Sequence, residues 1–165
     1  MSSDRMIIGL GHKSRVGKDT VGEHLNLCGF HKMSFAANLY AIVGEIQRIL
    51  GRPNVKDPAL LQKCGTMLRE HYGDDIFIDR LLEELPEAEN VVITDVRFKN
   101  EFDRLRDKGA VLIEIIRPDR LIDRDPNHIS EVDLDGANWD YGIENTGTIE
   151  ELCHTMDSIL RTEMR

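Results

Sequence analysis

Residues Gly9–Thr20 combine small, cationic and hydroxyl-bearing side chains in a spacing that suits phosphate binding. The stretch reads Gly-Leu-Gly-His-Lys-Ser-Arg-Val-Gly-Lys-Asp-Thr, follows the apolar run Met6–Ile8 and precedes a segment with helical spacing. A strand, a glycine-bearing loop, a lysine and a helix form the layout of a phosphate-binding P-loop. Backbone N–H groups of such a loop converge on anionic oxygens, and the helix dipole strengthens the attraction.

Within this loop, Lys18 places a cation on the transferred phosphates, and Asp19 and Thr20 can meet Mg²⁺ or phosphate oxygens. The predicted nucleotide contacts are Lys13, Ser14, Arg15, Val16, Gly17, Lys18, Asp19 and Thr20. Two positions depart from the usual G-x-x-x-x-G-K-[ST] pattern, because His12 stands at the first glycine and Asp19 follows the lysine. The alternative is an ordinary strand-to-helix turn with a solvated Lys18.

Charged residues follow a second apolar run, Val91–Thr94, where a buried strand is expected to end. Asp95 has the placement of a carboxylate that faces a phosphate loop and holds Mg²⁺. The alternative for Asp95 is an N-cap of a helix that starts near Val96. Arg97 offers a guanidinium for bidentate contact with a phosphoryl group, and a surface ion pair with Glu101 is its alternative.

The segment 117–135 is polar, carries three arginines and has no helical or strand period. These arginines are Arg117, Arg120 and Arg124. Arginines on such a loop suit a lid that closes over phosphates and excludes water, whereas in the alternative neighbouring aspartates neutralise them in solvent. His128 and Glu131 lack a third metal ligand at a recognisable spacing, so we expect them to hydrogen-bond to substrate or to the lid base.

A mostly helical interval, 36–86, is long for a crossover between strands and suits an element that folds over a substrate. Arg69, near a helix end, can reach a substrate phosphate or cap the carboxyl end of its own helix. Phe35 and Ala36 can wall a base or a small substrate, and a core position is the alternative for Phe35.

The chain has 165 residues, a formal net charge of −9, 41% hydrophobic and 31% charged residues, which is typical of one soluble globular domain. The acidic charge and the 5% of aromatic residues disfavour nucleic acid polymers as partners. Cys28, Cys64 and Cys153 show no metal-ligand spacing and are expected to be buried or partly buried free thiols. No signal peptide or membrane-spanning run is found, so we expect a cytoplasmic chain without a membrane partner.

Apolar runs and helical periods alternate along the chain, and this order predicts an α/β fold with a parallel sheet and right-handed crossovers. The expected strands are 5–10, 30–35, 91–94, 110–116 and 141–144. The expected helices are 18–28, 36–50, 58–71, 75–85, 98–108 and 148–161. Ligands of such sheets gather beyond the carboxyl ends of the strands, where the polar segments described above are expected to converge. We expect a single domain, 1–165, with 36–86 as an excursion and 117–135 as a lid.

Several of these elements occur together in an order that resembles a known family. They are Gly17-Lys18-Asp19-Thr20, Ser34-Phe35-Ala36, Leu61–Thr66 with Arg69, Thr94–Glu101, His128–Glu131, and Ile143-Glu144-Asn145 with Gly147-Thr148. The chain resembles phage-type deoxynucleoside monophosphate kinases of the adenylate-kinase-like P-loop group over nearly its whole length. This resemblance implies a three-layer α/β/α P-loop NTPase fold with a central parallel sheet of about five strands, a helical acceptor-binding excursion and a lid.

The resemblance also implies Mg²⁺-assisted transfer of the γ-phosphoryl group of ATP to a deoxynucleoside 5′-monophosphate. Its catalytic residues would be Lys18, Asp95, Arg97 and Arg117, with Arg120 and Arg124 on ATP and Asp19 and Asp95 at the metal. The acceptor would meet Phe35, Ala36, Arg69, Arg97, Asn100, Glu101, His128 and Glu131. Small-molecule nucleotides are the implied partners, and a homodimer is compatible with the family.

Two departures from the family pattern stand out. His12 replaces the first loop glycine, and Tyr40 stands where related chains often have a lysine. Two rival functions share the P-loop: a kinase of a non-nucleotide phosphate such as phosphomevalonate, and a nucleotide-binding switch without phosphoryl transfer.

Overall fold

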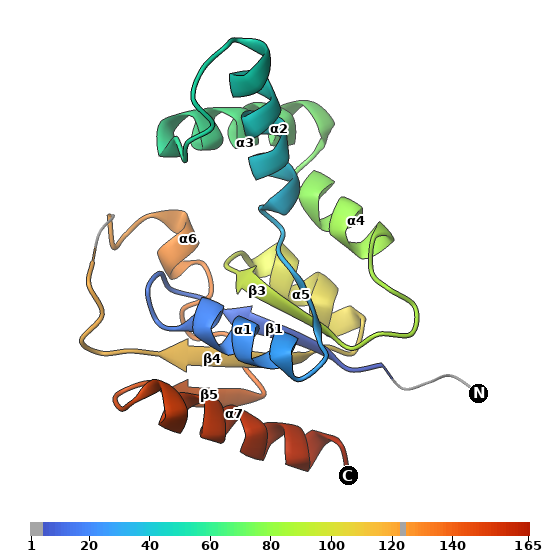
Figure 1. Ribbon diagram of the computed structural model, residues 1–165, viewed down its shortest axis with the longest axis vertical. Coiled ribbons are helices and arrows are strands. Elements are labelled where there is room, and N and C mark those ends of the chain that lie inside the picture. Colours follow the sequence, from blue (N-terminus) through green and yellow to red (C-terminus); the bar gives the residue numbers. More distant parts are fainter. Residues whose placement is uncertain (1–4, 123–124) are drawn as a thin grey trace. The chain divides into compact units, whose positions relative to one another are not determined.

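The computed structural model describes residues 5–122 and 125–165, and five parallel strands form one sheet within this part of the chain (Figure 1). The strands are β1 (Ile7–Gly11), β2 (His31–Met33), β3 (Val91–Val96), β4 (Val111–Ile116) and β5 (Tyr141–Glu144). They lie in the order β2-β3-β1-β4-β5, and every pairing is parallel. The predicted parallel sheet of about five strands is confirmed.

The chain divides into two compact units. The first contains the residues up to Met33 and those from Pro86 onward, and the second contains Ser34–Leu85. The whole sheet belongs to the first unit.

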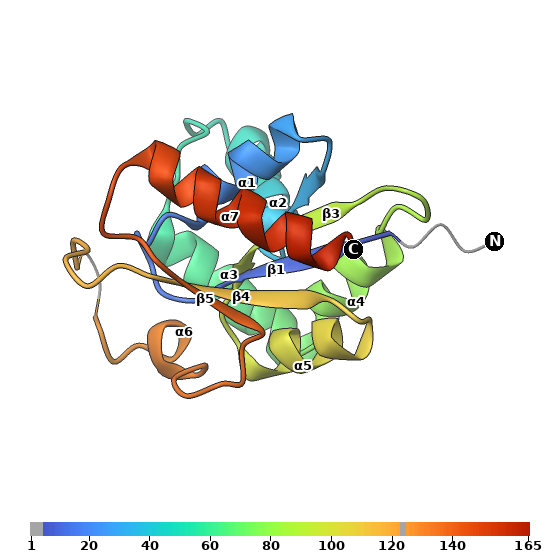
Figure 2. The ribbon, with the colours of Figure 1, turned by 90° about the horizontal axis from the view of Figure 1, so that it is seen from below.

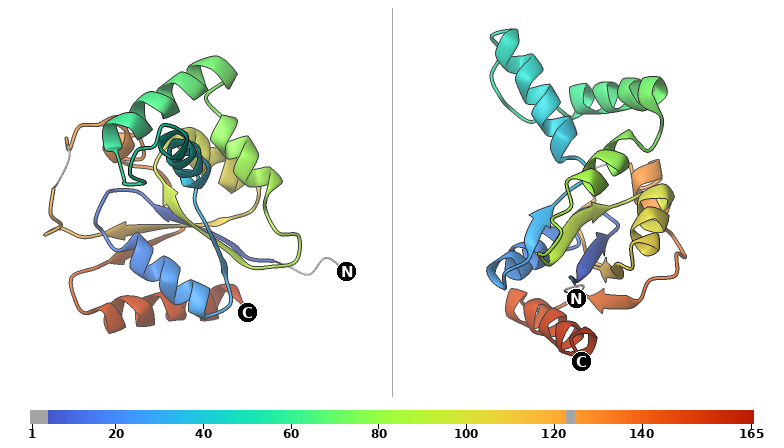
Figure 3. Two further views of the ribbon diagram at one scale, coloured as in Figure 1. Left: turned by 45° about the horizontal axis from the view of Figure 1, so that its top comes forward. Right: turned by 90° about the vertical axis from the view of Figure 1, so that its right-hand side faces the viewer.

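Helices cover both faces of the sheet in the first unit (Figures 2 and 3). On one face lie α1 (Lys18–Leu27) and α7 (Ile149–Glu163), and on the other lies α5 (Lys99–Asp107). The predicted three-layer α/β/α architecture is therefore confirmed.

Successive residues of the buried strand β1 face the helices on opposite sides of the sheet. Ile8 and Leu10 join the apolar core that includes Val21 and Leu25 of α1. Gly9 points to the opposite face, where a Cβ atom would lie only 3.2 Å from Leu105 of α5. Successive side chains of a strand point to opposite faces, so a strand buried on both sides reads as a continuous apolar run.

The second unit is helical. It contains α2 (Ala37–Ile49), α3 (Pro58–Tyr72) and α4 (Ile76–Glu83). Helix α3 begins with Pro58 after an Asp57 cap, whose carboxylate accepts a hydrogen bond from Leu60 N at 3.0 Å. A small core joins α2 and α3 through Val43, Leu61 and Cys64.

Three expectations need correction. Strand β3 continues through Val96 and α5 begins only at Lys99, so the alternative of Asp95 as a helix N-cap is wrong. A short helix, α6 (Ile129–Val132), interrupts the polar segment for which no helix was expected. The Cys28 thiol is exposed, because it lies at the C-cap of α1 rather than on its apolar face.

The four residues of α6 are too few to show a helical period, and a local cap helps to hold them. His128 Nδ1 accepts a hydrogen bond from Ser130 N at 3.2 Å, which satisfies one N–H at the start of the helix. In the described ranges, none of the helices combines the length and the apolar character that a membrane crossing needs.

Candidate active site

The loop between β1 and α1 contains two residues with a positive φ angle. Gly17 has φ 113° at the start of α1, and Arg15 has φ 55° two residues earlier. A Cβ atom on Gly17 would also lie 2.8 Å from Asn145 Nδ2. Left-handed residues in such a loop turn successive N–H groups toward one concave side, which suits an anion.

Lys18 lies within this loop with only 6% of its surface exposed, so the alternative of a solvated lysine is wrong for this structure. Its Nζ donates a hydrogen bond to the Lys13 carbonyl oxygen. Burial, together with the nearby Arg97 charge, lowers the pKa of Lys18 from 10.5 to about 7. The carboxylates of Asp19 and Asp95 act in the opposite direction. Near neutral pH the Lys18 amine is therefore only partly protonated, and a bound anion would favour its charged form.

ATP binding is predicted to take up a proton near pH 8. Phosphate oxygens beside Lys18 Nζ favour the ammonium form and raise its pKa above the free value of about 7. Affinity for ATP should therefore weaken as the pH rises from 7 toward the pKa of the bound state. Calorimetric titrations in two buffers of different ionisation enthalpy measure the proton. Equal heats in both buffers would contradict this prediction, and Lys18→Met should abolish the uptake.

Glu131 is fully buried and joins three parts of the site. Its Oε2 accepts hydrogen bonds from Ser14 N at 3.1 Å and Ser14 Oγ at 3.3 Å. Its Oε1 lies 3.2 Å from an Arg97 guanidinium nitrogen, and its Oε2 lies 3.2 Å from one of Arg120. Arg120 also donates to Ser14 Oγ at 3.0 Å and to the Ser14 carbonyl at 3.1 Å. One carboxylate thus holds two guanidinium groups against the phosphate loop.

Asp95 and Arg97 lie at the carboxyl end of β3, beside the loop. Asp95 is half-buried, and its charge acts on Lys18. The guanidinium of Arg97 pairs with Glu131 rather than Glu101, so the predicted alternative of a surface pair with Glu101 is wrong. Glu101 instead accepts hydrogen bonds from Arg97 N at 2.8 Å and Phe98 N at 3.0 Å, while Asn100 Oδ1 accepts from Glu101 N at 3.0 Å. These bonds fix the backbone that carries Arg97.

His12, the first residue of the loop, is buried. Its side chain is 1% exposed and stacks on Trp139, with ring centroids 5.8 Å apart. Its Nε2 lies 3.1 Å from Asp135 Oδ1, and its Nδ1 lies 3.4 Å from Glu114 Oε1. Burial lowers the pKa of His12, although the hydrogen bond with Asp135 opposes the shift. The replacement of the first loop glycine is thus matched by an aromatic partner.

Restoring the glycine, by His12→Gly, is predicted to lower the free energy of unfolding by about 2–4 kcal/mol, because it leaves a cavity beside Trp139. Urea unfolding measures the loss. His12→Phe keeps the stacking and loses the contacts with carboxylates, so it should cost less. Equal stability of His12→Gly and the parent would show that the imidazole does not support the loop.

The residues of segment 117–135, the predicted lid, lie in different surroundings. Arg120 has its side chain 11% exposed and reaches Ser14, whereas Arg117 is exposed and lies 3.4 Å from Asp119. Arg124 lies outside the described residues. His128 is exposed and caps α6. Of the two arginines of this segment that the structure describes, Arg120 is the one that contacts the phosphate loop.

The remaining loop residues differ in exposure. Lys13 donates to Asp135 Oδ1 at 2.7 Å and to the Glu131 carbonyl at 2.9 Å. Arg15 and Asp19 are exposed, Thr20 is half-buried, and Val16 is 1% exposed in the apolar core. Val16 can therefore offer a nucleotide only its backbone groups.

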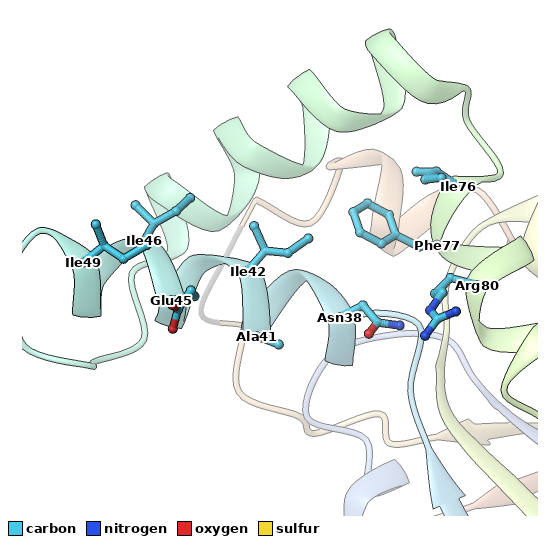
Figure 4. Close-up of a pocket in the computed structure, with 9 residues that line it drawn as sticks. All are labelled: Asn38, Ala41, Ile42, Glu45, Ile46, Ile49, Ile76, Phe77 and Arg80. Atoms are coloured by element: carbon cyan, nitrogen blue, oxygen red, sulfur yellow. The ribbon is translucent and has the colours of Figure 1, made fainter.

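Three predicted acceptor residues belong to the second unit. Phe35 is 3% exposed, Ala36 is half-buried ahead of α2, and the Arg69 guanidinium lies 5.1 Å from the Phe77 ring centre. In the same unit, α2 and α4 line a cavity of about 610 Å³ that is apolar apart from a few polar side chains (Figure 4). Its lining is Asn38, Ala41, Ile42, Glu45, Ile46, Ile49, Ile76, Phe77 and Arg80.

Sequence reasoning did not select Asn145 as a site residue. Its amide donates to the Val16 carbonyl oxygen at 2.8 Å and packs against Gly17. Asn145 follows β5 at the carboxyl edge of the sheet, so the rule that selected Asp95 could have found it. Asp135 and Trp139, by contrast, gave no local signal, since their partner His12 lies more than a hundred residues away in the sequence.

Comparison with known sequences identifies relatives of this chain. A family model described as deoxynucleotide monophosphate kinase matches residues 59–156. The chain is also 32% identical to a protein of Acanthamoeba polyphaga mimivirus named "Putative deoxynucleotide monophosphate kinase". That match covers 88% of this chain and 91% of the viral protein.

Solved structures resemble the fold. Dephospho-CoA kinase from Campylobacter jejuni matches with a TM-score of 0.60 and 15% identity, over 94% of this chain and 95% of its own. Shikimate kinase from Aquifex aeolicus matches with a TM-score of 0.54 and 18% identity, over 96% and 98%. At these identities the likeness shows the fold, which is that of P-loop kinases.

Proposed function

Because the chain belongs to the deoxynucleotide monophosphate kinase family, we propose that it transfers the γ-phosphoryl group of ATP to deoxynucleoside 5′-monophosphates and releases the diphosphates. The family makes the chain a kinase that acts on small nucleotides.

The observation that carries the proposal is the cluster of Lys18, Arg97 and Arg120 around one buried carboxylate at the phosphate loop. Phosphoryl transfer needs little covalent chemistry from the protein, so its catalysis depends on positioning and on neutralising charge. Lys18 would hold the β- and γ-phosphates of ATP. Arg97 would bridge donor and acceptor, and Arg120 would steady the charge of the transferring group. An oxygen of the acceptor phosphate attacks the γ-phosphorus, and the bond to the bridging oxygen of ADP breaks.

Residues that suit a magnesium ion lie beside Lys18. Asp19 and Asp95 offer carboxylate oxygens, the ligand type that Mg²⁺ prefers, and both act electrostatically on Lys18. We propose that these two residues hold the ion through direct or water-mediated contacts. When bound, Mg²⁺ would neutralise charge on the phosphates.

Residues of the second unit would supply the acceptor site. Arg69 offers a guanidinium for the monophosphate, and Phe35 and Ala36 would form part of a wall. Asn100, Glu101, His128 and Glu131 would act mainly by holding Arg97 and α6 in place, as their contacts with protein indicate.

An acceptor screen with ATP and Mg²⁺ tests the proposed substrate class. The panel contains the four common deoxynucleoside monophosphates, the matching ribonucleotides, and phosphomevalonate. We expect diphosphate products from at least one deoxynucleotide, and a smaller kcat/KM for its ribose counterpart. Turnover of phosphomevalonate without any nucleotide product would overturn the proposal in favour of the rival kinase, and ATP binding without transfer to any acceptor would favour the switch.

A further inference from the structure

Helices α1 and α7 pack against each other in the first unit and carry a second group of chemically active side chains (Figure 2). His24 and Cys28 lie four residues apart at the carboxyl end of α1, and Cys153 and Asp157 lie four residues apart on α7. Residues four apart share one face of a helix. The phosphate loop lies at the other end of α1, so this group is separate from the proposed active site.

Three of these side chains already converge. One potential ligand atom each from His24, Cys28 and Asp157 lie within 4.8 Å of one another. His24 Nε2 and Asp157 Oδ1 are 2.6 Å apart and form a hydrogen bond. Zinc bonds to nitrogen, sulfur and oxygen are about 2.0–2.3 Å long, which places tetrahedral ligand atoms roughly 3.3–3.8 Å apart. Small side-chain rotations would therefore suffice to admit an ion.

The cluster is open to solvent. His24 and Asp157 are partly exposed and Cys28 is exposed, so an ion has access from solvent.

We propose that His24, Cys28 and Asp157 bind a divalent cation of the zinc class, with a water molecule as the fourth ligand, and that the ion links α1 to α7. Mixed nitrogen, sulfur and oxygen ligands are typical of Zn²⁺, whereas Mg²⁺ and Ca²⁺ take oxygen ligands. The Cys28 thiol releases its proton to solvent, and His24 binds as the neutral ring. The ion replaces the His24–Asp157 hydrogen bond and stabilises the folded chain by mass action.

Titration of the reduced, chelator-treated full chain with Co²⁺ tests this site directly. We expect one Co²⁺ per chain, with a thiolate-to-cobalt charge-transfer band and the intense visible absorption of tetrahedral cobalt, and displacement of both by Zn²⁺. Cys28→Ala, His24→Ala and Asp157→Asn should each weaken binding at least about tenfold, the scale that changes around metal ligands reach. Added Zn²⁺ should raise the melting temperature of the parent protein but not that of these three variants.

Matched controls are available elsewhere in the chain. Cys64→Ala and His31→Gln remove a buried thiol and an exposed imidazole outside the cluster, and both should leave the cobalt spectrum unchanged. Melting curves of the metal-free variants separate lost binding from lost folding. Absence of a charge-transfer band, or an undiminished band in Cys28→Ala, would overturn the proposal.

Discussion

Replacement of Lys18 by methionine should reduce phosphoryl transfer by at least about 100-fold without lowering the stability of the fold. Lys18 is buried in the phosphate loop, where its cation would meet the charge that develops on the transferring group. Methionine keeps most of the side-chain volume and removes only the amine. Steady-state kinetics with ATP and a deoxynucleotide acceptor measure the loss, and urea unfolding measures the stability.

The pH dependence of stability gives this variant a second readout. The folded pKa of Lys18 is about 7, below its ordinary 10.5, so between these values the unfolded chain binds a proton that the folded chain lacks. The free energy of unfolding in the absence of ATP should therefore receive a contribution that rises with pH from about 7 to 10.5. Lys18→Met should lose this rise.

A surface lysine serves as the matched control. Lys108 is exposed at the carboxyl end of α5, and Lys108→Met should leave both the activity and the pH dependence unchanged. If Lys18→Met kept its activity, the assignment of residues 12–18 as the phosphate loop would be wrong.

Replacement of Glu131 by glutamine should lower the free energy of unfolding by about 3 kcal/mol, because it leaves two guanidinium groups without their buried counter-ion. Activity should fall on the order of 100-fold, since Ser14, Arg97 and Arg120 lose the group that aligns them. Glu131 would thus act as a positioning residue. Urea unfolding and kinetics on the same samples check both effects.

The control for this variant is a carboxylate on the surface. Glu87 is exposed, and Glu87→Gln should change stability by less than about 0.5 kcal/mol. A second test uses ATP affinity, which should fall in Glu131→Gln even at temperatures where the variant remains folded. Unchanged stability together with unchanged ATP affinity would contradict the role of Glu131 as the link between loop and arginines.

Much of the fold could be predicted because its local signals agree. Some elements are indicated by only a few residues. These are the apolar run of β1, the Asp57-Pro58 start of α3 and the Thr148 cap at the start of α7. The four-residue helix α6 is too short for a period and depends on His128 for its cap. Strand β3 extends past Thr94 because its ladder with β1 continues to the Gly11–Val96 pair, which no local pattern encodes.

Individual residues of the candidate site could be predicted from the sequence, but the contacts between distant segments could not. The strand-edge rule correctly brought Asp95 and Arg97 beside the phosphate loop. The pairing of Arg97 with Glu131, and of His12 with Asp135 and Trp139, joins segments far apart in the chain. The cluster of His24, Cys28 and Asp157 was missed for the same reason, since its residues meet only when α1 packs on α7.

The proposed reaction moves the γ-phosphoryl group of ATP onto a nucleotide phosphate at this site. Phosphorus NMR of the enzyme with ATP, Mg²⁺ and a deoxynucleoside monophosphate follows that group directly. We predict that the γ-phosphate of ATP becomes the β-phosphate of a deoxynucleoside diphosphate, and that Lys18→Met suppresses this signal. Appearance of the γ-phosphate only as inorganic phosphate, with no deoxynucleoside diphosphate from any base, would overturn the proposed function.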